Sequence, residues 1–304
     1  HSLFYFQALT FLKHQKSACY ALAVFLITTI RILAVYHTEN WEQTKESMTA
    51  WWRHEMDEPL VQVVAPKQGG ESSCVFDWWA LMRPGATMET ALADYLRFCE
   101  NTWFGGVAFP SMFFNLGPGV LAAYSSGYLR FESESCTTWF ENPQPWAVVE
   151  QYRFQENKWW QFTVTGMDRF AEAGKGKFVM GMTDLGGILD VLASFRGAQE
   201  LALDLLTEPD RVHAARKQLV QDWHLAYTRL HTLATRYQEG MSTWMGLWCP
   251  GRWYPLQCDF CAMISPQQFA EFVLPDIVTQ CDLLDYSIYH LDGPGQIEIG
   301  RAHV

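Results

Sequence analysis

The chain alternates between short apolar runs and longer segments of helical periodicity. Pro59–Pro66 (PLVQVVAP) is a β-branched run bounded by prolines, which predicts a strand. Val107–Gly119 reads as a strand that leads into a Gly/Pro loop. Trp159–Met167 and Lys177–Gly187 repeat this pattern, so each predicts a further strand.

Helical segments separate and follow these runs. Residues from His37 onward form an amphipathic pattern that predicts the first helix. Apolar residues recur every three or four positions from Val212 to Tyr237, and Gly240 then closes one long predicted helix. Ser265 with Pro266 and Gln268 gives an N-cap, a first-turn proline and a capping-box glutamine, which predicts another helix start.

Further strands are expected around Ser242–Trp248, at Leu256–Phe260 (LQCDF) and at Tyr286–His290 (YSIYH). Strands that alternate with helices predict a parallel α/β fold. Three predicted strands end in or near an aspartate, namely Asp184, Asp259 and Asp292. Since (β/α)₈ barrels carry their sites at the carboxyl ends of strands, we predict a TIM barrel. No G-x-G-x-x-G follows a strand, which disfavours a dinucleotide-binding sheet.

Composition narrows the possible functions. The chain has 304 residues, 49% of them hydrophobic, and a formal net charge of −11 without long runs of one sign. Nucleic acid is therefore not an expected partner, since phosphate binding needs a basic patch. Fourteen Trp residues indicate either a bulky core or a pocket for a large, flat ligand. Eight Cys residues do not form a dense disulfide pattern, so we expect a reduced, cytoplasmic setting.

Both ends of the chain look foreign to a barrel. Residues 1–36 contain an apolar run interrupted by Arg31, which we interpret as upstream translation; a membrane anchor and a core helix are the alternatives. Residues 298–304 resemble translated sequencing adapter. The expected domain is thus an incomplete barrel over 37–297, truncated at its carboxyl end and unstable alone because its strand edges are unpaired.

The most chemistry-like stretch is His290-Leu291-Asp292-Gly293. Residues two apart on a strand point the same way, so His290 and Asp292 are expected to face one cavity if the strand continues through Asp292. An imidazole and a carboxylate are both zinc ligands, which makes the pair a candidate metal and catalytic site. The alternative is structural: His290 would bond a neighbouring strand and Asp292 would cap a turn.

Other candidates lie on the neighbouring predicted strands. Asp259 is expected at the barrel mouth as a catalytic residue. Arg252 and Tyr254, in a Gly/Trp loop, and Asp184 are candidates for substrate binding. Cys258 should point away from Asp259, so a structural role is expected for it despite the Cys-x-x-Cys spacing with Cys261.

Three stretches resemble the uroporphyrinogen decarboxylase superfamily, which includes zinc-dependent methylcobamide:thiol methyltransferases. They are DLGGILDVLASFRGAQELALDLLTEPDRV, LQCDFCAMISPQQFAEFVLPDI and YSIYHLDGPG, in the order of the family. The resemblance runs from about Thr38 to Gln296 and implies a (β/α)₈ barrel.

Two departures affect the implied reaction. The arginine-rich segment that binds tetrapyrrole carboxylates is absent, since the matching region reads PKQGGESS. In the methyltransferase branch a His-x-Cys-Gly provides zinc ligands, and here Asp292 stands at the Cys position.

The resemblance to the methyltransferase branch implies methyl transfer involving a corrinoid, or a corrinoid protein as partner, and a thiol, with zinc at His290 and Asp292. Decarboxylation of uroporphyrinogen is the alternative enzyme activity. A non-catalytic corrinoid- or tetrapyrrole-binding protein is a third hypothesis. A glycoside hydrolase is the most distant, because no clear carboxylate pair is evident.

Overall fold

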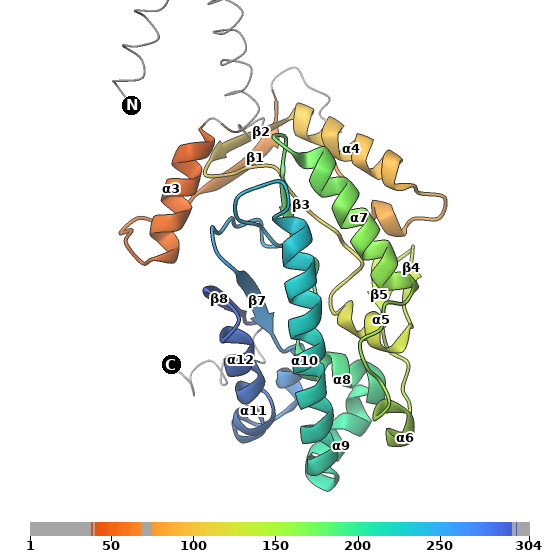
Figure 1. The fold of residues 1–304 in the computed structure, drawn as a ribbon. Helices are drawn as coiled ribbons and strands as arrows, with labels where there is room; N and C mark the ends of the chain where they lie inside the picture. Colours follow the sequence, from red (N-terminus) through yellow and green to blue (C-terminus); the bar gives the residue numbers. More distant parts are fainter. Residues whose placement is uncertain (1–37, 39, 68–74, 294–295, 297–304) are drawn as a thin grey trace, which may run out of the picture.

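The computed structural model describes residues 38, 40–67, 75–293 and 296 (Figure 1). The predictions for residues 1–36 and 298–304 lie outside the described residues. The described elements are α3 (Trp41–Trp52), β1 (Gln62–Pro66), η1 (Ala80–Met82), α4 (Met88–Asn101), β2 (Thr102–Gly106), β3 (Ser111–Phe113), α5 (Leu121–Ser126), β4 (Arg130–Glu132), β5 (Thr137–Trp139), α6 (Trp146–Val149), α7 (Lys158–Gly174), β6 (Val179–Gly181), α8 (Ile188–Arg196), α9 (Ala198–Thr207), α10 (Pro209–Ala234), β7 (Trp253–Gln257), η2 (Asp259–Met263), α11 (Pro266–Phe272), α12 (Leu274–Cys281) and β8 (Tyr286–His290).

The strands form separate pairs. β1–β2 and β4–β5 are antiparallel, whereas β3–β6 and β7–β8 are parallel. An isolated parallel bridge between Gly181 and Ser242 adds one residue pair beside β6. The predicted (β/α)₈ barrel of the uroporphyrinogen decarboxylase type is therefore wrong: such a barrel closes eight parallel strands into one sheet, and the described residues form a mixed α/β structure of two-stranded sheets.

Two segments expected as strands explain much of the difference. Trp159–Met167 lies within helix α7, whose N-cap Asn157 accepts hydrogen bonds from the N–H groups of Trp159 and Trp160. The segment around Ser242–Trp248 contributes only isolated bridge pairs. Without these two strands the parallel pairs are not joined into a continuous sheet.

Other predicted elements are confirmed. The long helix is α10, although it ends at Ala234, before Tyr237 and Gly240, and the YSIYH run is β8. Ser265 and Gln268 form the expected capping box at the start of α11, although that helix ends at Phe272 and α12 follows after Val273. The first helix begins at Trp41, after an Asn40 N-cap, a few residues later than expected.

Helix α10 is the central packing element. It contacts α7, α8, α9 and α12, and Figure 1 shows it running along the length of the molecule. Its buried stripe includes Trp223, Tyr227 and Leu230, each fully enclosed. The edge of the Trp223 ring meets Tyr254 of β7, with ring centroids 5.2 Å apart. This aromatic contact places β7 against the helical layer and so fixes the position of the residues that follow it.

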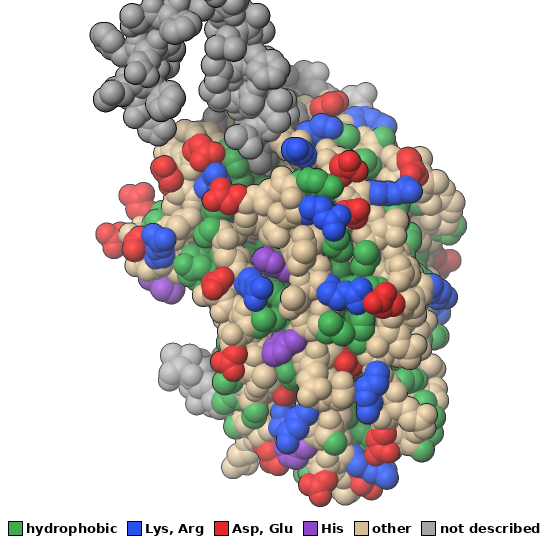
Figure 2. Space-filling model, in the orientation of Figure 1, with side chains coloured by type: hydrophobic (Ala, Val, Ile, Leu, Met, Phe, Trp, Pro, Cys, Tyr) green, Lys and Arg blue, Asp and Glu red, His purple; other side chains and the backbone are tan. Residues whose placement is uncertain are grey.

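Charged side chains of both signs are interspersed over the face shown in Figure 2. Among the described helices, none combines the length and apolar character that a bilayer crossing requires.

Candidate functional site

Asp184 lies in the loop that connects β6 to α8. Its Oδ1 accepts three hydrogen bonds, from the Gly186 N–H (2.9 Å), the Tyr254 hydroxyl (3.2 Å) and the Gln257 side-chain amide (3.3 Å). The Tyr254 hydroxyl in turn accepts from the Leu185 N–H at 2.7 Å. None of the hydrogen bonds among the described residues reaches Oδ2.

Two glycines allow the Asp184 loop to lie against its neighbours. Gly186 has a φ of +79°, and a Cβ there would lie 2.5 Å from the Cα of Gly119. A Cβ on Gly187 would lie 2.2 Å from the carbonyl oxygen of Gln257. Because no side chain fits at either position, the DLGG sequence is what lets the loop pack directly on β7.

Asp190, in the first turn of α8, joins this loop to η2. Its Oδ2 accepts from the Asp259 N–H at 3.0 Å, and its Oδ1 accepts from the Phe260 N–H at 2.7 Å. Both carboxylate oxygens thus bond backbone groups almost 70 residues away in the sequence. Asp190 therefore fixes the position of Asp259 relative to Asp184.

Burial dominates the electrostatics of these carboxylates. It is the largest cause that raises the pKa of Asp184 and that of Asp190, each to about 6, and the nearby Asp259 carboxylate acts in the same direction. Hydrogen bonds from neutral donors act in the opposite direction. No Lys or Arg of the described residues forms an ion pair with either group. Carboxyl groups of this kind exchange protons near neutral pH, as general acids and bases do.

His290 and Asp292 both act on Asp259. Burial is the largest cause that raises the pKa of Asp259, the Asp292 carboxylate raises it further, and His290 lowers it. The structure thus brings these three predicted residues into one electrostatic neighbourhood. However, β8 ends at His290, and Asp292 lies in the following loop, where its N–H donates to the Gln296 side chain at 3.0 Å.

The imidazole of His290 has an aromatic neighbour. Trp244 meets it edge-on, with ring centroids 5.1 Å apart and an interplanar angle of 86°. His290 Nδ1 and Trp244 Nε1 are both buried and have no hydrogen-bond partner among the described residues. Unpaired buried polar atoms are costly, so each is an available contact for a ligand.

Asp184, Asp190 and Asp259 are called the carboxyl cluster below, and the Cys-x-x-Cys pair lies beside it. Cys258 and Cys261 are both buried, reduced thiols. Burial raises the pKa of Cys258 well above its usual range, whereas a hydrogen bond with the Cys258 thiol lowers that of Cys261. The Cys261 sulfur also lies 3.8 Å from the Tyr289 hydroxyl. These contacts pack the start of η2 against β8.

Arg252 and Tyr254 occupy different places from those expected. Tyr254 is not in a loop; it is enclosed in β7 and bonds Asp184. Arg252 is exposed at the opposite end of β7 from Asp259, and its carbonyl oxygen accepts from the N–H groups of Asp285 and Tyr286. The structure therefore joins Tyr254 to the carboxyl cluster and separates Arg252 from it.

The predicted zinc site can be tested against the ligands at hand. The part of the chain that the structure describes contains no group of three or more His, Cys, Asp or Glu side chains that could hold a metal ion. His290 and Asp292 alone do not make the ligand set of a zinc enzyme, which takes three protein ligands. We therefore derive no chemical step through zinc.

Two residues of the site were missed by sequence reasoning. Asp190 carried no signal of its own, because acidic residues are common in the first turn of a helix. Gln257 precedes the Cys-Asp pair in β7 and was passed over as part of the strand. Both act through partners about 70 residues away, and no local pattern predicts such pairs.

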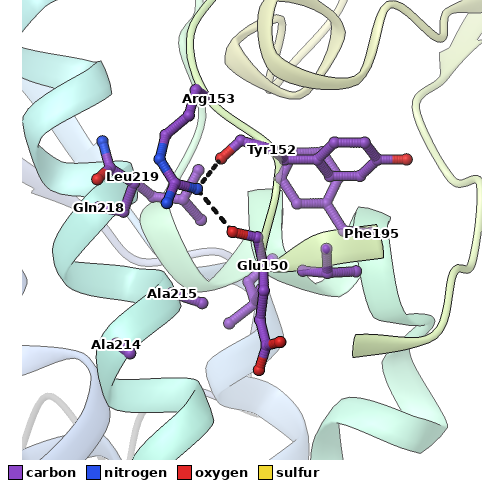
Figure 3. A pocket seen from close by; sticks show the side chains of 10 residues that line it. Glu150, Tyr152, Arg153, Phe195, Ala214, Ala215, Gln218 and Leu219 are labelled. Atoms are coloured by element: carbon purple, nitrogen blue, oxygen red, sulfur yellow. Dashed lines mark hydrogen bonds between the residues drawn. The ribbon is translucent and has the colours of Figure 1, made fainter. Parts of the chain in front are cut away.

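A cavity of about 260 Å³ lies apart from this cluster, between α6, α8 and α10 (Figure 3). Arg153 borders it and donates to the carbonyl oxygens of Glu150 and Tyr152 at 2.8 and 2.7 Å. The Arg153 guanidinium is thus occupied in part by the backbone of its own loop.

The chain was compared with protein-family models and with curated proteins. No protein-family model matches the chain, and no curated protein matches it. The resemblance to the uroporphyrinogen decarboxylase superfamily remains a prediction from its motifs.

Proposed function

We propose that the chain is an enzyme that decarboxylates an organic acid, with Asp184 as the proton donor. The observation that supports this function is a buried carboxyl group with a pKa of about 6, held on one oxygen by neutral donors while its second oxygen has no partner among the described residues. Such a group is protonated in a useful fraction near neutral pH, and a well-placed general acid contributes roughly 10²–10⁴-fold to rate.

The substrate carboxylate leaves as CO₂, and its bonding electron pair remains on carbon. Asp184 transfers the proton on Oδ2 to that carbon and becomes a carboxylate, which water reprotonates. Tyr254 and Gln257 orient Oδ1 by hydrogen bonds at 3.2 and 3.3 Å, and Asp190 positions Asp259 at the same edge.

Decarboxylation fits the described residues better than methyl transfer. The methyl-transfer reaction implied by the resemblance uses a metal to activate a thiol, and the described residues do not assemble its ligand set. Protonation of a carbanion needs only an acid in a water-poor setting. The cytoplasmic compartment expected from the cysteine pattern stays part of this proposal.

Two measurements test the proposal. The ¹³C chemical shift of the Asp184 carboxyl should titrate near pH 6; a midpoint below pH 4.5 would contradict the assigned role. In addition, the protein should release CO₂ from at least one member of a panel of aromatic and tetrapyrrole carboxylic acids. In D₂O, the carbon that loses CO₂ should take up deuterium.

The matched variants are Asp184→Asn and Asp222→Asn. Asp222 is also a buried carboxylate, but it bonds the Phe154 N–H and Gln218 away from the strand ends. We expect a loss of at least 100-fold for Asp184→Asn and little change for Asp222→Asn. Activity should fall as the pH rises above about 6, because the acid must be protonated to act.

Metal-assisted methyl transfer from a corrinoid is the second candidate. It is supported by the shared action of His290 and Asp292 on Asp259. Stoichiometric zinc in the purified protein, lost in His290→Ala, would favour it over decarboxylation. Tight tetrapyrrole binding without turnover would instead favour a non-catalytic binding protein.

A further inference from the structure

A second cavity, of about 290 Å³, differs in chemistry from the one in Figure 3. Its walls come from β1, β2, β3, α4 and the segment after Met241. The aromatic side chains that line it include Trp78, Phe98, Phe104, Phe109, Phe113 and Trp244. Among the described residues, none that lines it is charged, whereas Glu150 and Arg153 border the other cavity.

The rings of this cavity form an ordered set. Trp78 and Phe113 stack at 5.2 Å with an interplanar angle of 20°, and Phe104 meets Phe98 edge-on at 6.2 Å. Trp78 is 38% exposed, so the stack can be reached from outside. Stacked and edge-on faces are the surfaces that a further aromatic ring prefers to contact.

Volume and polarity limit the occupant. A cavity of 290 Å³ equals the volume of about ten water molecules, at roughly 30 Å³ each, which suits one or two fused rings. A tetrapyrrole macrocycle with several carboxylates does not match this space, and no described lining residue offers a cation to those carboxylates. Two polar atoms of the lining residues, the Tyr95 hydroxyl and Trp244 Nε1, are buried and have no hydrogen-bond partner among the described residues.

We infer that this cavity binds an uncharged, planar aromatic group of one or two fused rings that carries a hydrogen-bond acceptor for Trp244. Trp244 also contacts His290, whose imidazole acts on Asp259, so one lining residue links the cavity to that carboxyl group. The idea that this ring is part of the substrate rests on the proposed function. Binding of the ring to the cavity does not depend on that function.

Isothermal titration at pH 7.5 with three probes of similar size tests the inference. Quinoline is uncharged and has an acceptor, naphthalene lacks the acceptor, and 2-naphthoate is an anion. We expect quinoline to bind at least tenfold more tightly than 2-naphthoate. Equal affinity of the two, or no quinoline binding up to 10 mM, would overturn the inference.

Two cavity-filling variants locate the site. Ser111→Leu adds bulk to the aromatic cavity and should weaken quinoline binding at least tenfold. Ala215→Leu also places a leucine side chain in a cavity, that of Figure 3, and should leave quinoline binding unchanged. The reverse result would place the ligand in the wrong cavity for this inference.

Trp244→Phe gives a readout that does not depend on filling the cavity. It keeps a ring but removes the N–H, so quinoline should bind roughly 5–10-fold more weakly while naphthalene is unaffected. An equal loss for both probes would contradict the acceptor contact. If quinoline binds as expected but Asp184→Asn leaves CO₂ release intact, the cavity stands and the proposed reaction fails.

Discussion

Two regions of the molecule bury aspartates in different ways. At two helix interfaces a buried carboxylate faces an arginine: Asp276 of α12 lies 2.5 Å from Arg216 of α10, and Asp204 lies 2.8 Å from Arg196. At the strand ends, Asp184 and Asp190 receive only hydrogen bonds from neutral donors. The first arrangement joins helices through ion pairs, whereas the second holds the carboxyl groups through hydrogen bonds from neutral donors alone. Burial raises the pKa of Asp276 to about 6 as well, so the difference lies in the partners and not in the pKa.

The two arrangements affect the stability of the fold in different ways. A paired carboxylate balances its desolvation against an opposite charge, so removing the partner is what destabilises the fold. A carboxylate without a cation is itself destabilising when ionised, and a fold retains it at the expense of stability. Three experiments examine this contrast, from the largest expected effect to the smallest.

The largest effect is expected from Arg216→Met. The substitution leaves the Asp276 carboxylate buried without its cation and should reduce the free energy of unfolding by about 3–5 kcal/mol in urea denaturation. The double variant Arg216→Met/Asp276→Leu should recover most of this loss. As a control, Arg97→Met breaks an exposed pair with Asp94 and should change stability by less than about 0.5 kcal/mol. A loss below 1 kcal/mol for Arg216→Met would remove the distinction between the two regions.

Asp184→Asn should have the opposite sign, and its effect should depend on pH. The folded pKa of Asp184, about 6, exceeds its ordinary value of 3.8, so between these values the folded state holds a proton that the unfolded state has lost. This contribution is complete below about pH 4 and is lost as the pH rises through 6. Removing the charge should therefore stabilise the protein by roughly 3 kcal/mol at pH 7.5 and by almost nothing at pH 4. Denaturation curves at the two pH values measure the difference; the same shift at both would refute it.

The smallest effect is expected from Tyr254→Phe. The variant removes a donor to Asp184 and leaves the buried Leu185 N–H without an acceptor, which should cost about 1–3 kcal/mol. Because the lost hydrogen bond favoured the ionised form, the pKa of Asp184 should rise above 6. Titration of the Asp184 ¹³C signal in the variant checks the direction, and an unchanged or lower pKa would show that Tyr254 does not hold the carboxylate.

The sequence predicted local features better than long-range ones. The Ser265 capping box, the α10 stripe and β8 depend on neighbours a few positions apart, and all three are confirmed. The segment Trp159–Met167 misled because its aromatic and β-branched residues favour strands, yet Trp160, Thr163 and Met167 bury one face of helix α7. Tertiary packing overrode local preference there.

The candidate site shows the same limit. Sequence reasoning selected Asp184, Asp259, His290 and Asp292, and the structure places the last three in one neighbourhood. The predicted reason, that His290 and Asp292 stand two apart on one strand, is wrong, because β8 ends at His290. The role of Asp190 depends on backbone amides about 70 residues away, and the aromatic cavity collects side chains from five parts of the chain. No local periodicity in the sequence predicts contacts between residues so far apart along the chain.

The close packing of the DLGG loop has a kinetic meaning as well. With Gly186 against Gly119 and Gly187 against Gln257, the backbone that follows Asp184 packs too closely for a side chain at either position. The dipolar surroundings of the Asp184 carboxyl are therefore set during folding, and little reorganisation energy remains to be supplied when charge moves during a reaction. For the proposed reaction, a larger residue at either glycine would therefore be expected to add reorganisation energy to the proton transfer.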